Sequence, residues 1–197
     1  MKLESPSALR NRDEILVELR RALPTRGTLL EVASGVGIHC CFFAPHFPSL
    51  RWQPTDRDPE RLASIRAYAA ERVIDNLAAP LELDTTWETW PVEQAAAMVN
   101  INMIHASPWE ATLGLFAGAR RTLSPGGLLF VYGAYKRHGH TTAPSNLAFD
   151  ARLKERDPRW GVRQLEDVVA AAEAAGLRLE EVRAVPNNNC VVLYRQP

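Results

Sequence analysis

The sequence predicts an α/β protein with a doubly wound, mostly parallel sheet of seven strands that ends in an antiparallel hairpin. Three observations support this fold class. Short apolar runs alternate with amphipathic stretches along the chain. Glycine or aspartate stands where several of the apolar runs end. The last two runs are separated only by Pro186-Asn187-Asn188-Asn189, a spacing typical of a hairpin.

The first half of the chain contains two units of strand, turn and helix. Residues 6–23 form an amphipathic helix that Ser5 or Ser7 can cap, and Pro6 suits its first turn. The remaining elements follow from apolar runs, caps and breakers. They are a strand at 28–33, a glycine-rich turn at 34–37, a helix at 38–46, a strand at 50–55 and a helix at 59–73 capped by Asp58.

The second half continues the alternation. We expect strands at 80–84, 96–102 and 128–132, a helix at 108–122 capped by Ser107, helices at 146–156 and 163–175, and final strands at 177–185 and 190–195. No linker or repeat interrupts the pattern, so residues 1–197 are interpreted as one Rossmann-like domain. Residues 1–25 would be an N-terminal helix or lid, and residues 136–162 an insertion near the active face.

The composition excludes several classes of partner. The 197 residues include 23 basic and 23 acidic side chains, and 46% are hydrophobic. A zero net charge argues against a nucleic-acid partner or an anionic membrane surface. No apolar run is long enough to span a membrane, and the polar start is unlike a leader peptide. The three cysteines, at positions 40, 41 and 190, fit neither disulfides nor a metal site, so we expect a cytoplasmic protein, monomeric or homodimeric.

The residues best suited to bind a ligand lie at and near the first strand-to-helix turn. The glycines of Ser34-Gly35-Val36-Gly37 would let the backbone approach a ligand, and the following helix offers free N–H groups. Asp56 ends the second strand, where a carboxylate can accept hydrogen bonds from both hydroxyls of a ribose. Glu31 and Asp84, at the ends of the first and third strands, complete an acidic rim that suits a cationic nucleoside better than a pyrophosphate.

These residues resemble the Class I S-adenosylmethionine-dependent methyltransferases. The glycine-loop motif of that class matches Glu31-x-Ala33-x-Gly35-x-Gly37, although Ala33 replaces the usual first glycine. Its ribose motif matches Thr55-Asp56-Arg57-Asp58-Pro59, and Leu83-Asp84 is similar to its adenine motif. The turn Leu123-Ser-Pro125-Gly126-Gly127 is similar to the one before strand five. The match covers residues 28–135.

A narrower resemblance covers nearly the whole chain. The sequence is similar to the family, of unassigned substrate, that includes methyltransferase-like protein twenty-six of animals. The matching words are Arg10-Asn11-Arg12-Asp13, Leu30-Glu-Val-Ala-Ser-Gly35, Trp52-Gln-Pro-Thr-Asp56, Asn100-Ile-Asn102-Met, Tyr132-Gly-Ala-Tyr135, Ser145-Asn146, Phe149-Asp150, Trp160-Gly161-Val-Arg163 and Pro186-Asn-Asn188-Asn189.

The class resemblance implies the cofactor S-adenosyl-L-methionine, its product S-adenosyl-L-homocysteine, and a role for each matching residue. Glu31 would stabilise the methionine end and the backbone of 33–37 would cradle it. Asp56 would bind the ribose, and Asp84 with the backbone after it would bind adenine. The implied cofactor-binding residues are Glu31, Ala33, Ser34, Gly35, Gly37, Asp56, Arg57, Asp84, Thr85 and Asn102.

The acceptor side is predicted from polar residues outside this core. Asn102 and Tyr132 are predicted to be catalytic residues, because Asn102 ends strand four, where the class places its reaction centre, and Tyr132 lies near the end of strand five. His105 is a candidate general base because its ordinary pKa is near neutral, and its alternative role is a structural hydrogen bond. Arg12 or Arg163 would pair with an acceptor carboxylate. The predicted substrate-binding residues are Asn11, Arg12, Tyr135, Asn146, Asp150, Arg163, Asn188 and Asn189.

We therefore predict methyl transfer to a small polar metabolite by in-line attack on the sulfonium methyl. The main alternative is a protein that binds S-adenosylmethionine or S-adenosylhomocysteine but catalyses a cyclisation or rearrangement, or only binds. A nicotinamide dehydrogenase is disfavoured because the third glycine is missing and the rim is acidic. An RNA or protein methyltransferase is disfavoured by the neutral charge. His138-Gly139-His140 lacks an evident third ligand, so no metal is predicted.

Overall fold

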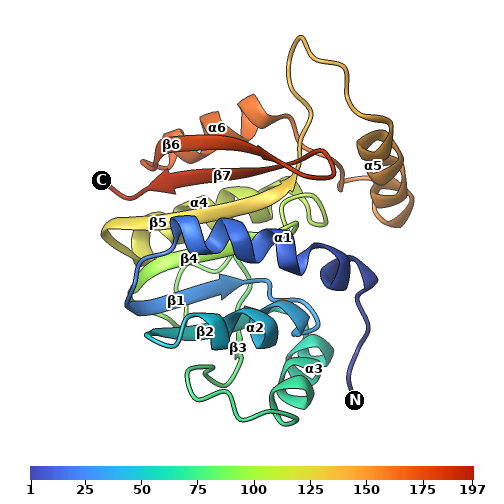
Figure 1. Cartoon of the computed structure of the whole chain (residues 1–197). Coiled ribbons are helices and arrows are strands. Elements are labelled where there is room, and N and C mark those ends of the chain that lie inside the picture. Colours follow the sequence, from blue (N-terminus) through green and yellow to red (C-terminus); the bar gives the residue numbers. More distant parts are fainter.

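The computed structural model describes all residues 1–197, and its helices and strands alternate as the sequence predicts (Figure 1). Helix caps agree with the sequence in two places. The Ser5 hydroxyl accepts the Ala8 N–H at 3.4 Å, and the Asp58 carboxylate accepts the Glu60 N–H at 2.9 Å. In chain order the elements are α1 (Pro6–Ala22), β1 (Gly27–Val32), α2 (Ile38–Phe43), the 3-10 helix η1 (Ala44–His46), β2 (Leu50–Asp56), α3 (Pro59–Ala69), β3 (Leu81–Glu82), β4 (Ala95–Ile101), α4 (Trp109–Thr122), β5 (Leu123–Ala134), α5 (Pro144–Arg156), α6 (Leu165–Ala174), β6 (Arg178–Val185) and β7 (Asn189–Arg195).

The strands form one sheet in the order β3-β2-β1-β4-β5-β7-β6. The first five strands are parallel, and β7 is antiparallel to both β5 and β6. The strand order reverses between β1 and β4, and ligands of such sheets bind beyond the carboxyl ends of the strands at this point. This arrangement confirms the predicted seven-stranded fold with its C-terminal hairpin. Asn187 and Asn188 form the hairpin tip, both with a φ of 58°.

Several predicted boundaries differ from the structure. The helix expected at 59–73 ends at Ala69, and the helices expected at 146–156 and 163–175 are Pro144–Arg156 and Leu165–Ala174. The helix expected at 38–46 is α-helical only to Phe43 and then tightens into η1. Strand β3 is two residues long, because only Thr55 and Asp56 of β2 pair with it. The expected cap Ser107 instead donates its hydroxyl to the Met103 carbonyl at 2.8 Å, and Pro108 takes the cap position before α4. Strand β5 is longer than predicted, because Leu123 already pairs with Ala95.

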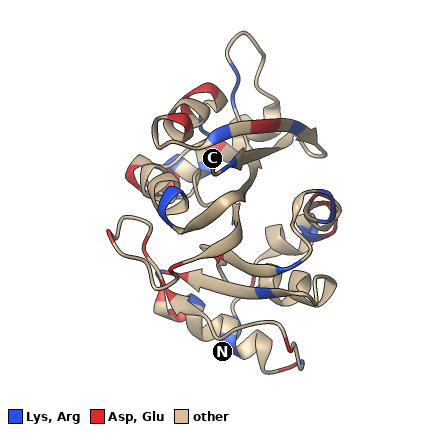
Figure 2. Ribbon diagram, turned by 90° about the vertical axis from the view of Figure 1, so that its left-hand side faces the viewer, with Lys and Arg blue, Asp and Glu red and all other residues tan.

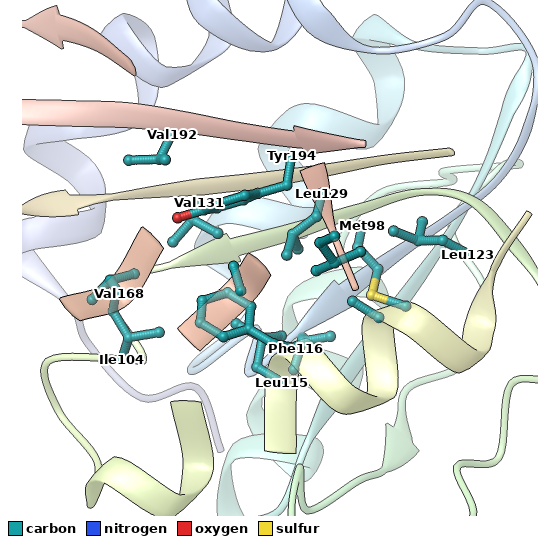
Figure 3. Packing of buried hydrophobic residues seen from close by; sticks show 14 of the residues in the cluster. Met98, Ile104, Leu115, Phe116, Leu123, Leu129, Val131, Val168, Val192 and Tyr194 are labelled. Atoms are coloured by element: carbon teal, nitrogen blue, oxygen red, sulfur yellow. The ribbon is translucent and has the colours of Figure 1, made fainter. Parts of the chain in front are cut away.

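Helices cover both faces of the sheet. Helices α1, α2 and α3 pack on one face with Leu29, Trp52 and Phe130, whereas α4 and α6 pack on the other with Leu129 and Tyr194. Figure 3 shows Leu115 and Phe116 of α4 within this second cluster. Because successive side chains of β5 point to opposite faces, Tyr132 faces α1, whereas Val131 faces α4 and α6.

Charged residues are scattered over the outside of the fold. Figure 2 shows acidic and basic residues interspersed along the helices and loops, with no long segment of one sign. No helix has the length and apolar character that crossing a bilayer requires.

Candidate active site

The glycine-rich turn after β1 is held in place by the end of β2. The Gly35 N–H donates to Oδ2 of Asp56 at 2.9 Å, and the Ser34 N–H donates to the Thr55 carbonyl at 2.7 Å. Gly37 has a φ of 100°, and a Cβ there would lie 2.8 Å from Cα of Ile65. The second glycine of the motif is therefore needed both for its backbone conformation and for the approach of α3.

Ala33 occupies the position where the class has its first glycine. Its φ is 58°, in the left-handed region that favours glycine. The small side chain keeps the turn, at a conformational cost of about 1 kcal/mol.

A cavity of about 340 Å³ lies against this turn, at the carboxyl edge of the sheet. We call it the glycine-loop cavity. Figure 1 shows that the N-terminal segment, α3 and α5 gather on the side toward which β1 points. Four predicted cofactor residues line the cavity, and these are Ala33, Ser34, Gly35 and Asn102. Its other walls include Ser7, Asn11, His39, Arg61, Met103, Ala106, Arg156 and Trp160.

The acidic side chains predicted to form a rim are not among the residues that line this cavity, and each already has partners. Oε2 of Glu31 accepts the indole N–H of Trp52 at 2.6 Å, and burial raises the pKa of Glu31 to about 8. Asp56 is 1% exposed, accepts the N–H groups of Gly35 and Asp58, and has a pKa raised by burial. Asp56 thus holds the turn through Gly35, whereas the Glu31 carboxyl is bonded to Trp52 of β2.

The third acidic residue, Asp84, lies two residues after β3 and is partly exposed. Its Oδ1 accepts the N–H and hydroxyl of Thr86 at 3.0 and 2.8 Å, and Arg57 pairs with Oδ2 at 3.4 Å. Thr85 is buried beside it, where its carbonyl abuts Gly114 of α4. Neither these residues nor Glu31, Gly37 and Asp56 are among those that line the glycine-loop cavity.

A second cavity, of about 290 Å³, adjoins the first, and we call it the tyrosine cavity. It is lined by Ser7, Arg10, Asn11, Glu14, Asn102, Tyr132, Phe149, Asn187 and Asn189. Ser7, Asn11 and Asn102 line both cavities. Asn102 follows β4 with a φ of 61°, and its N–H donates to the Tyr132 carbonyl at 2.9 Å. The two cavities therefore meet where the class resemblance places the reaction centre.

Helix α1 forms the wall that both cavities share. Asn11 accepts a hydrogen bond from Nε2 of His39 at 3.0 Å, which ties α1 to α2. Burial lowers the pKa of His39 to about 4, so this imidazole is neutral near pH 7 and can donate. Helix α1 is packed on the sheet, and its residues Ile15, Leu16 and Leu19 lie in the core.

The fold agrees with comparisons to known proteins. A model of the family described as "Protein of unknown function (DUF938)" matches residues 2–196. The chain belongs to this family. Among solved structures, it is similar to the mitomycin 7-O-methyltransferase MmcR, with a TM-score of 0.82 and 20% identity over 96% of this chain and 54% of that chain.

Two further solved structures are similar to this DUF938 chain. One is an O-methyltransferase family 2 protein from Planctomyces limnophilus in complex with apigenin, with a TM-score of 0.77 and 20% identity over 100% of this chain and 63% of that one. The other is the calicheamicin-biosynthesis methyltransferase CalO1 in its SAH-bound form, with a TM-score of 0.75 and 21% identity over 94% and 54%. The DUF938 chain thus spans a little over half the length of these proteins and shares their methyltransferase fold.

His105 is not placed as the predicted general base requires. It is 0% exposed and lines neither cavity, and its ring lies 5.2 Å from that of Tyr135 on the opposite face of the sheet from Tyr132. Its Nδ1 faces the Arg163 N–H at 3.4 Å, and its carbonyl accepts the Gly161 N–H at 2.9 Å. Burial lowers the pKa of His105 to about 3. The geometry corresponds to the structural alternative.

Several predicted substrate residues instead brace the segment 136–162 against the core. The guanidinium of Arg163 donates to the carbonyls of Ile104 at 3.0 Å and Ser107 at 2.6 Å. Asn146 donates to the Asn188 carbonyl at 2.9 Å, and Asn188 donates to the Ser145 hydroxyl at 3.2 Å.

Two other predicted substrate residues make packing contacts away from both cavities. The guanidinium of Arg12 lies 4.5 Å from the centroid of the Phe42 ring. Tyr135 is 6% exposed and lies in the core on the α4 and α6 face of the sheet. Of the eight predicted substrate residues, only Asn11 and Asn189 line a cavity described above.

Asp150 is the centre of this bracing, and we predict that its replacement affects stability rather than ligand binding. Its Oδ2 accepts from Lys136 and Lys154, both at 2.8 Å, and its Oδ1 accepts the Val162 N–H at 2.8 Å. Asp150→Ala should lower the free energy of unfolding by about 1–3 kcal/mol, measured by chemical denaturation. Glu155→Ala, at an exposed site of α5, is the control. If Asp150→Ala left the stability unchanged but impaired methylation of the acceptor, the result would contradict this prediction and support a role in substrate binding.

The charged residues of the tyrosine cavity, Arg10 and Glu14, were not predicted from the sequence. Ser7, Arg10, Asn11 and Glu14 follow the i, i+3, i+4, i+7 spacing of one helix face. That polar stripe in the predicted helix 6–23 was a usable signal. The partner of the stripe, Tyr132, was predicted as a site residue, but the contact between them joins residues 118 positions apart.

Proposed function

We propose that this protein transfers a methyl group from S-adenosyl-L-methionine to a small polar acceptor, releasing S-adenosyl-L-homocysteine. The observation that supports this most directly is the meeting of two cavities at Asn102. One is lined by a glycine turn and the other by polar side chains, at the strand-order reversal where ligands of such sheets bind. The similar fold of CalO1 in its SAH-bound form agrees with this donor.

The residues present fit this donor. A Cβ built on Gly35 would meet no atom within 4 Å, so the turn is open for a ligand to approach its backbone. In our proposal the segment 33–37 holds the amino-acid end, and Asp56 binds the ribose with the lone pairs that its two N–H partners leave free. Arg57, Asp84 and Thr85 border the adenine. The Glu31 carboxyl is bonded to Trp52, so in our proposal it does not contact the methionine amino group.

When bound, the donor supplies an electrophilic methyl group on a sulfonium. The chain must then hold a nucleophile in line with that methyl group and exclude water. Asn102 lies between the two cavities and can orient the acceptor by hydrogen bonding. Tyr132 and Asn189 offer further polar contacts in the tyrosine cavity, and α1 with Trp160 limits access of water.

Methyl transfer can be tested with a donor that carries a labelled methyl group. The purified protein is incubated with this donor and the small-molecule fraction of an extract of the cells that make it, and labelled products are separated from unused donor. We expect a labelled small molecule that depends on the protein, and binding of S-adenosylhomocysteine by calorimetry. Donor binding with no labelled product would favour the alternative of a non-methylating or purely binding role. Absence of donor binding would contradict the proposal.

A further inference from the structure

The tyrosine cavity contains a carboxylate whose position is fixed from two sides. The Tyr132 hydroxyl donates to Oε1 of Glu14, and Nδ2 of Asn187 donates to Oε2 at 2.9 Å. The three residues come from α1, β5 and the hairpin tip, which are distant in sequence. Hydrogen bonds from two other elements therefore fix the orientation of the Glu14 carboxylate in the tyrosine cavity.

Within this group Glu14 accepts the hydrogen bond and Tyr132 donates it. Burial and the hydrogen bond to Glu14 raise the pKa of Tyr132 far above its ordinary value, so Tyr132 remains a phenol and acts as a donor. A carboxylate has about four lone-pair sites, and Tyr132 and Asn187 occupy two of them. The remaining sites can accept a proton from a molecule in the cavity.

A cation lies one helical turn from this carboxylate. Arg10 lines the same cavity, is exposed, and takes part in none of the ion pairs within the chain. Residues four apart on a helix are about 6 Å apart along its axis. A small molecule of a size that fits about 290 Å³ can therefore reach Arg10 with an anionic group and Glu14 with a hydroxyl group.

We infer that Glu14 is the general base of the proposed methyl transfer, and that the acceptor is a small anionic molecule with a hydroxyl group whose anionic part pairs with Arg10. This inference rests on the proposed function. A neutral hydroxyl is a weak nucleophile, so a positioned base adds directly to the rate.

The proposed step balances in atoms and charge. The hydroxyl oxygen of the acceptor forms a bond to the methyl carbon as the bond from that carbon to the donor sulfur breaks. The bonding electron pair stays on sulfur, which loses its positive charge. The hydroxyl proton moves to Glu14, and Glu14 returns it to solvent after the product leaves.

Three variants and an extract separated by charge test this inference. The small-molecule fraction is divided by ion exchange into anionic, neutral and cationic pools, and each is incubated with labelled donor. We expect the label in the anionic pool. Glu14→Gln should lower kcat by about 10²–10⁴-fold, a typical contribution of general base catalysis, while the Kd for S-adenosylhomocysteine measured by calorimetry stays within about twofold. Arg10→Gln should raise the acceptor KM more than it lowers kcat.

Asp13→Asn is the matched control. Asp13 is the exposed neighbour of Glu14 on α1, so its replacement makes the same change in net charge outside the cavity and should leave kcat unchanged. Equal kcat for wild type and Glu14→Gln would overturn the role of Glu14. Label in the neutral or cationic pool would overturn the acceptor class. A wild-type protein that neither binds donor nor transfers methyl would overturn the proposed function and this inference with it.

Discussion

Asp56→Ala is expected to reduce the affinity for S-adenosylmethionine by at least about 100-fold. Two effects act together. The variant loses charged hydrogen bonds to the ribose, each contributing about 1.5–3 kcal/mol in a buried site. It also releases the Gly35 N–H, which Oδ2 of Asp56 holds at 2.9 Å, so the turn that lines the cavity loses its anchor. Calorimetric titration with S-adenosylhomocysteine measures the change.

Asp58→Ala provides the comparison for Asp56→Ala. It removes a carboxylate two residues away that caps α3 and pairs with Arg61 at 3.7 Å, and it is more exposed than Asp56. This variant should lose about 1 kcal/mol of stability and keep its donor affinity. Undiminished donor binding by a folded Asp56→Ala variant would show that the ribose is held elsewhere.

The free energy of unfolding is expected to reach its maximum near pH 6.5. Burial lowers the pKa of His105 to about 3 and of His39 to about 4, so both rings are neutral in the folded protein but bind protons when unfolded below pH 6.5. Stability therefore rises with pH up to about 6.5. Burial raises the pKa of Glu31 to about 8, so between pH 4.5 and 8 the folded protein holds a proton that the unfolded chain releases. This group lowers stability as pH rises.

The histidines and Glu31 change the free energy of unfolding with pH in opposite directions, so its dependence on pH has a maximum. Between pH 4.5 and 6.5 the protons bound by the two unfolded histidines outnumber the one that folded Glu31 retains, whereas above pH 6.5 the proton on Glu31 dominates. We expect a loss of about 1–2 kcal/mol between pH 6.5 and 8, measured by chemical denaturation at several pH values. Glu31→Gln keeps an acceptor for the Trp52 N–H and should remove this loss, whereas Glu93→Gln, at an exposed site, should retain it. A loss of the same size in Glu31→Gln would contradict the assignment.

Much of the fold was predictable because it depends on local pattern. Alternating apolar runs and helix signals such as Ser5 and Asp58 set the elements, and the parallel arrangement follows from the helical connections between them. The spacing of Gly35 and Gly37 before a helix also predicted where the first cavity lies. These features depend on residues that are close in sequence.

The missed parts of the site depend on which face of the sheet a side chain takes. Asn102 turns the chain sharply after β4 with a φ of 61°, and His105 packs against Tyr135, opposite the face that carries Tyr132. The number of residues between the strand end and His105 does not show on which face of the sheet His105 packs. The contacts of Arg163 with backbone carbonyls and of Glu14 with Tyr132 join distant segments, so neither was visible in local spacing.

In our proposal the glycine-loop cavity binds S-adenosylmethionine next to the acceptor site. A crystal structure of the protein with S-adenosylhomocysteine tests it most directly. We expect the ligand in the glycine-loop cavity, against the backbone of 33–37, with its sulfur toward Asn102 and the tyrosine cavity left free. A ligand bound in another cavity, or with its sulfur turned away from Asn102, would contradict it.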